Sequence, residues 1–318
     1  MPVGSLLDVL IIGAGPAGLS AALSMGRVLR SAVVFDSKSY RNSKSSNAHT
    51  VPTRDHEDPA AIREMMKKEL TSKYKTTTFA ESAATSVQEV DGGYQVVDEN
   101  TRKWNARKLI IATGVYDVLP NIPGFSHAWG KGVFHCLYCR GFEEAGAPNA
   151  AVIINRGDSA EIDITVFNSQ LAHQFTRNLT ILLNGHEHLF KDSKIKTAVD
   201  HGVKINSQTI RRIEWSGPDP STKVVFDDGT EETFGFLIHT PETKLVGSFH
   251  ETLNLELTSA GDIAITSPFQ ETSRPGVFAC GDCATGFKKV AFAMADGIRA
   301  GMGANLQIME EDFSRSWW

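Results

Sequence analysis

The sequence predicts an α/β protein built from two Rossmann-like, three-layer nucleotide-binding domains. Gly13-Ala14-Gly15-Pro16-Ala17-Gly18 follows the apolar run Leu7 to Ile12 and leads into an alanine-rich helical stretch. The pattern recurs at Val152-Ile153-Ile154-Asn155-Arg156-Gly157-Asp158-Ser159-Ala160, with Asn155 in place of the first glycine. A strand, a tight glycine turn and a helix N-terminus are typical of a site for the pyrophosphate of a dinucleotide. The 318 residues are enough for two domains, each with its own core.

Composition restricts the classes of partner. The formal net charge is -5 at pH 7 and the pI is near 6.1, without a lysine-rich or arginine-rich block that would attract a polyanion. We therefore expect no nucleic-acid partner. Residues 1–5 lack the basic segment of a secretory leader, and the apolar stretch from Val9 to Met25 is interrupted by Gly and Pro. We expect a soluble cytoplasmic protein with no membrane partner.

The elements of the first domain follow in order. The β-branched run after the first helix ends at Asp36, 21 residues after Gly15, where an acid is expected to bind ribose hydroxyls. The polar segment from Arg41 to Pro59 predicts irregular structure with cofactor contacts, and Pro59 opens a helical pattern that extends to about Lys73. The remaining strands are expected at Ala83 to Val90, at Tyr94 to Val97 after the turn Asp91-Gly92-Gly93, and from Lys108 to the small-residue turn at Gly114.

The rest of the chain repeats the alternation of strands and helices. A first domain boundary is predicted near Tyr116, because Pro120, Pro123 and Gly124 follow it closely. The second β-α-β unit is predicted as a strand from Ala150 to Asn155, a helix from Asp158 to about Arg177 and a strand from Leu179 to Leu183. Further strands are expected near Val224 and Phe236, at Ile263 to Ile265 and at Gly276 to Cys280, with a return crossing at Pro241 to Gly247 and a last helix from about Lys288 to Met309.

The cysteines form two C-x-x-C pairs, Cys136/Cys139 and Cys280/Cys283. Four cysteines are too few for a secreted disulfide scaffold of this length, so their pairing indicates redox or metal chemistry in a reducing compartment. Four zinc ligands are the competing interpretation, which the 140 residues between the pairs disfavour. No metal site is predicted.

The order of the motifs resembles that of the low-molecular-weight thioredoxin reductases over nearly the whole chain. The motifs are the first fingerprint, Ala112-Thr113-Gly114, Cys136-Leu137-Tyr138-Cys139, Gly157-Asp158-Ser159-Ala160 and Pro275-Gly276-Val277-Phe278-Ala279-Cys280-Gly281-Asp282. The resemblance implies an FAD domain formed by residues 1–116 and 247–318. It implies a smaller nucleotide-type domain, residues 117–246, that is inserted between them and carries the Cys136/Cys139 pair. It also implies a homodimer.

The same resemblance implies the residues that bind FAD. They are Gly13, Gly15, Pro16, Ala17, Gly18, Asp36, Arg41, Asn47, Ala112, Thr113, Gly114, Gly281, Asp282, Lys289 and Val290. Asp282 is expected to meet the ribityl or phosphate region of FAD. Cys280 is expected to be a small buried residue on a strand, and the role of Cys283 is left open.

Departures from the thioredoxin-reductase pattern concern the second cofactor. Family members that use NADPH have a glycine at the position of Asn155 and a basic cluster after the second strand. Here that strand runs into Asn184-Gly185-His186, without Arg or Lys to pair with a 2′-phosphate. The Cβ and amide of Asn155 also obstruct the approach of a pyrophosphate to the backbone. We expect that pyridine-nucleotide use is lost, with a working NADH site as the alternative.

If NADPH does not supply electrons, a dithiol must. The sequence resembles the FAD-dependent dithiol oxidases of fungal and bacterial natural-product clusters, which close disulfides in small molecules such as epidithiodiketopiperazines. The resemblance includes His135, Tyr138, the Arg140-Gly141-Phe142-Glu143 continuation and Cys283. Thioredoxin reductases commonly have a proton-donating acid at the position of Arg140, and an arginine cannot take that role because it stays protonated.

The resemblance implies a flavin-proximal Cys139, an outer Cys136, and His135 as a base or a stabiliser of the outer thiolate. A thiolate of the small-molecule dithiol attacks Cys136 and its second thiol resolves the mixed disulfide. The electrons then pass to FAD and to O2, giving hydrogen peroxide. Two alternatives stay open: an NAD(P)H-dependent disulfide reductase acting on a thioredoxin-like protein, and a non-catalytic flavin redox sensor.

Overall fold

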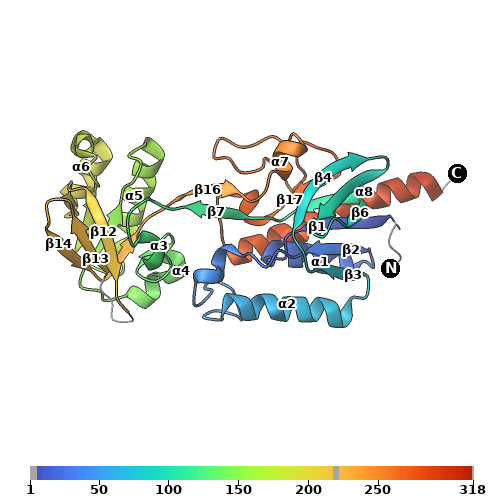
Figure 1. Cartoon of the computed structure of the whole chain (residues 1–318), viewed down its shortest axis with the longest axis horizontal. Coiled ribbons are helices and arrows are strands. Elements are labelled where there is room, and N and C mark those ends of the chain that lie inside the picture. Colours follow the sequence, from blue (N-terminus) through green and yellow to red (C-terminus); the bar gives the residue numbers. More distant parts are fainter. Residues whose placement is uncertain (1–5, 218–221, 317–318) are drawn as a thin grey trace. The chain divides into compact units, whose positions relative to one another are not determined.

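A computed structural model describes residues 6–217 and 222–316 of the chain. The chain folds into two compact units (Figure 1). Unit 1 combines the N-terminal segment up to Tyr116 with the C-terminal segment from Thr243, and unit 2 is the continuous segment Asp117–Glu242. The two segments that connect the units, β7 (Val115–Val118) and β16 (Glu242–Leu245), pair as a two-stranded sheet.

Unit 1 is built on a sheet whose central strands are parallel. Its strand order is β3 (Thr77–Ala80), β2 (Ala32–Phe35), β1 (Leu7–Ile12), β6 (Lys103–Ile111), β5 (Gly93–Asp98) and β4 (Ala84–Val90), and β17 (Val277–Ala279) also pairs with β6. The pairs β1–β2, β2–β3, β1–β6 and β6–β17 are parallel, whereas β4–β5 and β5–β6 are antiparallel. Every residue of β2 and of β17 is buried, as expected of strands that are covered on both faces.

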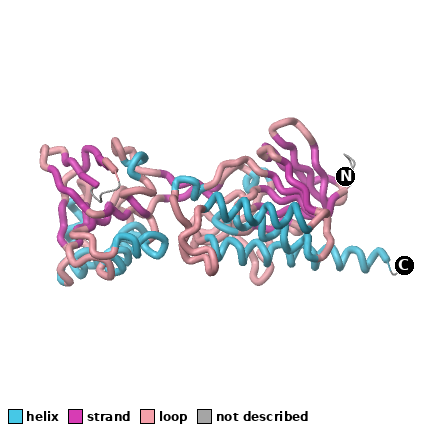
Figure 2. The backbone as a smooth tube through the Cα atoms, turned by 90° about the horizontal axis from the view of Figure 1, so that it is seen from below, coloured by secondary structure: helices cyan, strands magenta, loops and turns pink. Residues whose placement is uncertain are grey.

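Different layers cover the two faces of this sheet. Val9 and Ile11 pack with α1 (Pro16–Arg27) and α8 (Val290–Ser316), while Leu10 and Ile12 belong to a core on the other face with the β4–β5 hairpin and α7 (Phe249–Thr252). This alternation follows from the period of two along a strand. Helix α2 (Pro59–Lys73) packs beside α1, and Figure 2 shows the long helices of unit 1 running together along its strands.

Unit 2 repeats the three-layer plan on a smaller scale. Its parallel sheet has the order β11 (Lys204–Asn206), β10 (Leu179–Leu182), β9 (Ala150–Ile153), β15 (Phe236–Ile238) and β8 (Val133–Phe134). One face packs against α5 (Ser159–Ala172) and α6 (Ser193–Asp200). The other face packs against α3 (Phe125–Ala128) and the antiparallel sheet β12 (Ile210–Trp215), β13 (Thr222–Phe226) and β14 (Glu231–Phe234). The predicted fold class, two three-layer Rossmann-like units, is confirmed.

Several predicted elements need correction. Residues Ile263 to Ile265 do not form a strand, because Ile263 makes an isolated bridge with Leu257 and its N–H donates to the Cys283 carbonyl. Helix α5 ends at Ala172 and not near Arg177, since the following residues turn and bring Phe175 against the core of unit 2. The last helix extends to Ser316. The elements that were not predicted include β3, β8, β11, β12, β14 and α6.

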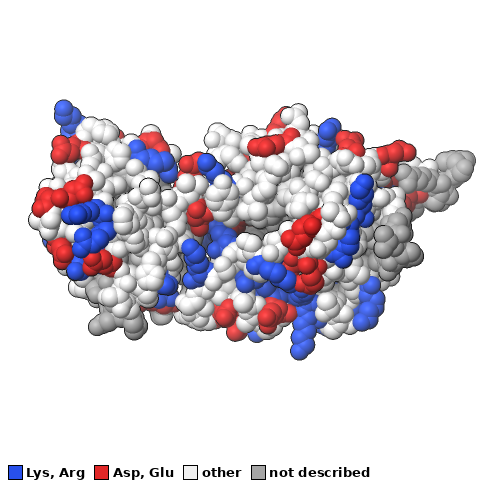
Figure 3. All heavy atoms as spheres, viewed as in Figure 1, with Lys and Arg blue, Asp and Glu red and all other residues white. Residues whose placement is uncertain are grey.

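Two surface properties bear on the expected partners. Within the described residues, no helix combines the length and the apolar character that a membrane crossing requires. Lysine and arginine side chains are interspersed with aspartate and glutamate on the face shown in Figure 3.

Candidate functional site

The loop after β1 is shaped by two glycines that leave no room for a side chain. Gly13 has φ +114°, and a Cβ built on it would lie 2.3 Å from the Ala112 carbonyl oxygen. A Cβ on Gly18 would lie 1.9 Å from the Gly13 carbonyl oxygen. These two positions therefore allow α1 to pack closely on β1 and β6.

Gly15 differs, because a Cβ built on it meets nothing within 4 Å. The space in front of this residue is open, and a side chain at this position would fill it. Gly15 is also the N-cap of α1, which has Pro16 in its first turn, no side-chain cap and no acidic residue there. Because the first N–H groups of a helix lack intrahelical partners and carry partial positive charge, this N-terminus fits a phosphate group. The loop thus suits the pyrophosphate of a dinucleotide.

Asp36 follows β2 directly, and its side chain is 2 % exposed. Its carboxylate accepts hydrogen bonds from the backbone N–H of Lys38 (3.0 Å), from Lys38 Nζ (2.7 Å) and from the Tyr40 hydroxyl (2.6 Å). Burial raises the pKa of Asp36, but these hydrogen bonds outweigh it and hold the pKa below its ordinary value. An ionised carboxylate at this strand end is a suitable acceptor for a ribose hydroxyl.

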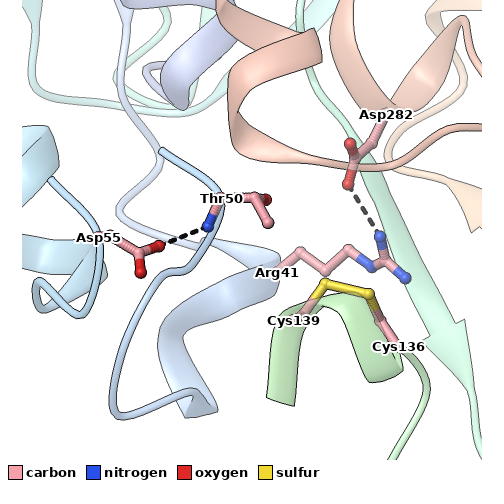
Figure 4. Close-up of a disulfide and its surroundings, with 6 residues drawn as sticks. All are labelled: Arg41, Thr50, Asp55, Cys136, Cys139 and Asp282. Atoms are coloured by element: carbon pink, nitrogen blue, oxygen red, sulfur yellow. Dashed lines mark hydrogen bonds and ion pairs between the residues drawn. A yellow bond between two sulfur atoms is a disulfide. The ribbon is translucent and has the colours of Figure 1, made fainter. Parts of the chain in front are cut away.

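Residues from both segments of unit 1 meet at a second point. Arg41 Nη1 lies 2.9 Å from Asp282 Oδ2, although 241 positions separate the two residues in sequence (Figure 4). Arg41 begins a short 3-10 helix, and Asp282 follows β17 in another. In the irregular segment, the Asn47 side-chain amide donates to the His56 carbonyl at 2.6 Å.

The other predicted cofactor residues lie where strands end or helices begin. Ala112, Thr113 and Gly114 follow β6, and Gly114 has φ +70° with open space at its Cβ position. Gly281 has φ +73°, and a Cβ there would lie 2.7 Å from the Ala17 Cβ. Lys289 precedes the first residue of α8, Val290, and its carbonyl accepts the Ala293 N–H.

Cys136 and Cys139 of unit 2 are joined in a disulfide, with 5.2 Å between their Cα atoms (Figure 4). Cys136 is the N-cap of the one-turn helix α4 (Leu137–Arg140), and the Cys139 N–H donates to the Cys136 carbonyl at 3.2 Å. Both cysteines are half-buried. One helical turn thus holds the two cysteines at the Cα separation of a disulfide.

Polar and aromatic residues flank the cysteine pair in the sequence. His135 stacks on Trp129, with ring centroids 5.7 Å apart. Arg140 Nε lies 3.3 Å from Glu144 Oε1, and burial raises the pKa of Glu144 although its hydrogen bond with Arg140 acts in the opposite direction. Tyr138, between the cysteines, is exposed.

The second C-x-x-C pair has a different environment. Cys280 and Cys283 of unit 1 are free thiols and fully buried. Burial raises the pKa of both, for Cys283 to about 11. The Cys283 thiol donates to the carbonyls of Ile111 (3.4 Å) and Cys280 (3.3 Å). These two thiols are thus poor nucleophiles near neutral pH, since the thiolate is the reactive form.

The loop after β9 corresponds to the loop after β1, but it holds a carboxylate of the chain itself. Glu161, in the first turn of α5, has a side chain that is 2 % exposed. Its Oε1 accepts the Asn155 N–H at 2.9 Å, and its Oε2 accepts the N–H groups of Arg156 (2.6 Å) and Gly157 (2.8 Å). Asp158 caps the same helix by accepting the Glu161 N–H at 2.9 Å.

A histidine lies on the other side of this loop. His186 Nε2 is 3.1 Å from the Asn155 carbonyl oxygen, and a Cβ built on Gly157 would lie 2.8 Å from His186 Nδ1. The space in front of Gly157 is thus occupied, whereas the space in front of Gly15 is open. Sequence reasoning did not identify Glu161 or a role for His186. The Asp158-Ser159-Ala160-Glu161 pattern of a capping box was the available signal for Glu161.

Comparisons with known proteins agree over nearly the full chain. The model of the family described as pyridine nucleotide-disulphide oxidoreductase matches residues 7–297. The chain is 44% identical to thioredoxin reductase sirT of Leptosphaeria maculans, over 98% of this chain and 97% of that protein. It is 40% identical to thioredoxin reductase aclD of Aspergillus oryzae, over 95% and 96%. An oxidoreductase from Agrobacterium tumefaciens superposes with a TM-score of 0.85 at 29% identity, over 96% of this chain and 99% of that one.

Proposed function

The chain belongs to the pyridine nucleotide-disulphide oxidoreductase family, and from this premise we propose that it is an FAD-dependent dithiol oxidase. It closes a disulfide in a small-molecule dithiol, uses O2 as the final acceptor and works without NADPH. The observation that carries the proposal is the contrast between the two units. Unit 1 presents an open glycine loop at an uncapped helix, whereas the matching loop of unit 2 is filled by its own side chains.

FAD fits the loop of unit 1. The N-terminus of α1 and the space in front of Gly15 would hold its pyrophosphate, and Asp36 would accept from its ribose. The Arg41–Asp282 pair would contact the ribityl or phosphate region, and Lys289 and Val290, at the start of α8, would also contact the cofactor. When bound, FAD supplies a two-electron acceptor that can react with O2.

The Cys136–Cys139 disulfide supplies the exchange chemistry. A substrate thiolate attacks Cys136 Sγ, which breaks the enzyme disulfide, forms a mixed disulfide and releases the Cys139 thiolate. The second substrate thiol loses its proton and attacks the substrate sulfur of the mixed disulfide. The bond from that sulfur to Cys136 Sγ breaks and releases the Cys136 thiolate. The substrate is then a disulfide and the enzyme a dithiol, so two electrons have passed to the cysteine pair. In the full cycle, one dithiol and one O2 give one disulfide and one hydrogen peroxide.

His135 and Arg140 flank the cysteine pair in the sequence and would assist at the sulfurs. His135 directly precedes Cys136 and is held by its stack on Trp129. His135 takes the proton of the attacking thiol, or, as a protonated imidazole, stabilises the Cys136 thiolate. Arg140, one residue after Cys139, adds positive charge that favours thiolates and cannot itself donate a proton.

The relatives named thioredoxin reductase support a second candidate, an NAD(P)H-dependent disulfide reductase. Such an enzyme needs a nucleotide site in unit 2. There, Asn155 replaces the first glycine, and Asn184-Gly185-His186 follows β10 in place of a basic cluster. These features favour the oxidase.

Anaerobic reduction of the purified flavoprotein separates the candidates. The flavin absorbance is followed after adding excess NADPH in one cuvette and a small-molecule dithiol in another. We expect the dithiol alone to bleach the flavin, and hydrogen peroxide to appear when air is readmitted. Rapid bleaching by NADPH would overturn the proposal in favour of the reductase, and the absence of bleaching by both would favour a redox sensor.

A further inference from the structure

We infer that Glu161 is a specificity-determining residue: its carboxylate occupies the place of a dinucleotide pyrophosphate in unit 2 and thereby excludes pyridine nucleotides. The inference deepens the proposed function and rests on it for one point, the independence from NADPH. It is carried by the contacts of the loop after β9.

The chemistry of the loop is that of an anion site. Three successive backbone N–H groups, from Asn155 to Gly157, converge on one carboxylate at 2.6–2.9 Å. Backbone donors of this arrangement at the start of a helix are what a phosphate binds in a glycine-rich nucleotide loop. Here the bound anion is Glu161, supplied by the helix that the loop leads into.

The corresponding position in unit 1 shows what the glutamate changes. In the alignment of the two fingerprints, Gly13 corresponds to Asn155, Gly15 to Gly157 and Leu19 to Glu161. Leu19 is 1 % exposed and packs into the core, so it makes no polar contact with its loop. The Gly13 N–H donates to the Phe35 carbonyl at 3.1 Å, and Leu19 takes none of the donors of the first loop. In the second loop, one acidic side chain uses three of them.

An incoming phosphate would also meet unfavourable charge. The Glu161 carboxylate cannot leave the loop without exposing three donors and losing charge-assisted hydrogen bonds. Asp158 lies at the same helix start, and its Oδ2 pairs with Arg156 Nε at 2.6 Å. His239 also faces Glu161, and its Nδ1 lies 3.9 Å from Glu161 Oε1. His186 fills the remaining space in front of Gly157.

The test measures anion binding to the flavin-bound protein, in which the loop of unit 1 is occupied by its cofactor. Inorganic pyrophosphate is titrated into the wild type, Glu161→Ala, Glu161→Gln and Asp163→Asn, with binding followed by calorimetry and by the midpoint of thermal unfolding. Asp163→Asn is the matched control, because it removes an exposed carboxylate two residues further along α5, where it pairs with Lys194. Sodium sulfate at equal ionic strength corrects for salt effects.

We expect pyrophosphate to bind Glu161→Ala and Glu161→Gln more tightly than the wild type by about ten-fold or more, and to raise the unfolding midpoints of these variants only. Equal affinity in the wild type and in Glu161→Ala, or a gain in Asp163→Asn of the same size, would overturn the inference. If Glu161→Ala does not fold, Glu161→Gln alone decides by the same criterion.

Turnover on the same samples separates this inference from the proposed function. Oxidation of a dithiol by the wild type, without any gain of pyrophosphate binding in the variants, would refute the role of Glu161 and leave the oxidase standing. A gain of binding in the variants, with no dithiol oxidation by the wild type, would refute the oxidase and leave the role of Glu161 standing.

Discussion

At the scale of single residues, Gly15 and Gly157 occupy matching positions in two loops but face different surroundings. The space in front of Gly15 is open, and that in front of Gly157 is filled by His186. A glycine in a fingerprint therefore predicts the path of the backbone, and only the neighbours decide whether a ligand can reach it.

The two cysteine pairs also differ by environment and not by spacing. Cys136 and Cys139 are half-buried and form a disulfide, whereas Cys280 and Cys283 are buried free thiols. The C-x-x-C pattern indicated redox or metal chemistry for both pairs. The disulfide at the first pair and the buried thiols of the second support placing the proposed exchange chemistry at the first pair. Burial disfavours the thiolate of the second pair.

A substitution of either exchange cysteine tests this assignment. Cys136→Ser and Cys139→Ser remove one sulfur of the disulfide, so dithiol oxidation should fall by about 1000-fold or more. The flavin content should be unchanged, because both residues belong to unit 2. The measurement is peroxide formation per flavin.

Cys283→Ala is the matched control, because it removes a thiol outside the proposed exchange pair. It should retain activity within about three-fold. Loss of activity in this variant alone, with activity retained in Cys136→Ser, would contradict the assignment.

At the scale of the elements, α1 and α8 approach closely because glycines face the partner helix. A Cβ built on Gly297 of α8 would lie 2.0 Å from the Ala17 carbonyl oxygen, and one built on Gly301 would lie 2.8 Å from the Ser24 Cβ. The alanine- and glycine-rich composition of this helix was visible in the sequence. Its partner was not, because 262 residues separate the end of α1 at Arg27 from the start of α8 at Val290.

Gly297→Ala should therefore weaken the packing of α8 on α1. The added methyl group meets backbone, which cannot yield as a side chain can, so we expect the free energy of unfolding to fall by about 3 kcal/mol. Urea unfolding of the flavin-bound protein measures the change. Gly286→Ala is the control, because a Cβ there meets nothing within 4 Å; equal stability of the two variants would refute the packing argument.

An ion-pair cluster fixes the C-terminal part of α8 to β6. Glu311 lies 2.5 Å from Lys108 Nζ and 2.7 Å from Arg107 Nη2. Burial raises the pKa of Glu311, but the hydrogen bonds from Lys108 and Arg107 outweigh it and hold the pKa below its ordinary value. The stabilisation is therefore present above the ordinary glutamate pKa and lost as the pH falls through the lower pKa of the folded state.

Glu311→Gln should lower the free energy of unfolding by about 1 kcal/mol at neutral pH, a modest value because the carboxylate is partly exposed. The difference between wild type and variant should shrink as the pH is lowered from about 6 to about 3. Urea unfolding across this range measures it, with the exposed neighbour Glu310→Gln as the control. A difference that grows on acidification would contradict the assigned shift.

At the scale of the whole molecule, α8 presents an apolar row to its surroundings. Ile298, Met302, Leu306 and Met309 are each between 38% and 48% exposed and lie on one face of the helix at spacings of three and four residues. An exposed row of this kind is typical of an interface. It supports the homodimer that the resemblance implies.

Sedimentation should therefore give a mass of about twice 34.7 kDa for the wild type. Leu306→Glu places a charge in the row and should shift the protein toward the monomer. Lys68→Glu, a charge change on the exposed side of α2, is the control. A monomeric wild type would refute the dimer.

The sequence by itself determined the α/β class, the strand, loop and helix of each fingerprint, and the bounds of α2. It also identified the cysteine pair that is proposed to exchange disulfides. These features depend on local periodicity, on glycine and proline conformation and on short spacings, all of which act within a few residues. Compared with the pattern of the NADPH-using thioredoxin reductases that the sequence resembles, Asn155 and Asn184-Gly185-His186 also indicated an altered second nucleotide site.

The tertiary structure decided which groups meet. It brought Arg41 to Asp282, packed Gly297 on Ala17, and turned the Glu161 carboxylate into the loop that its own helix follows. The irregular segment near Ile263 is stabilised by hydrogen bonds to Cys283 and Glu256 and not by a sheet. Hydrogen bonds and packing between distant positions depend on the final fold. At two matching positions, Leu19 is buried in the core, whereas the Glu161 carboxylate accepts hydrogen bonds from its loop.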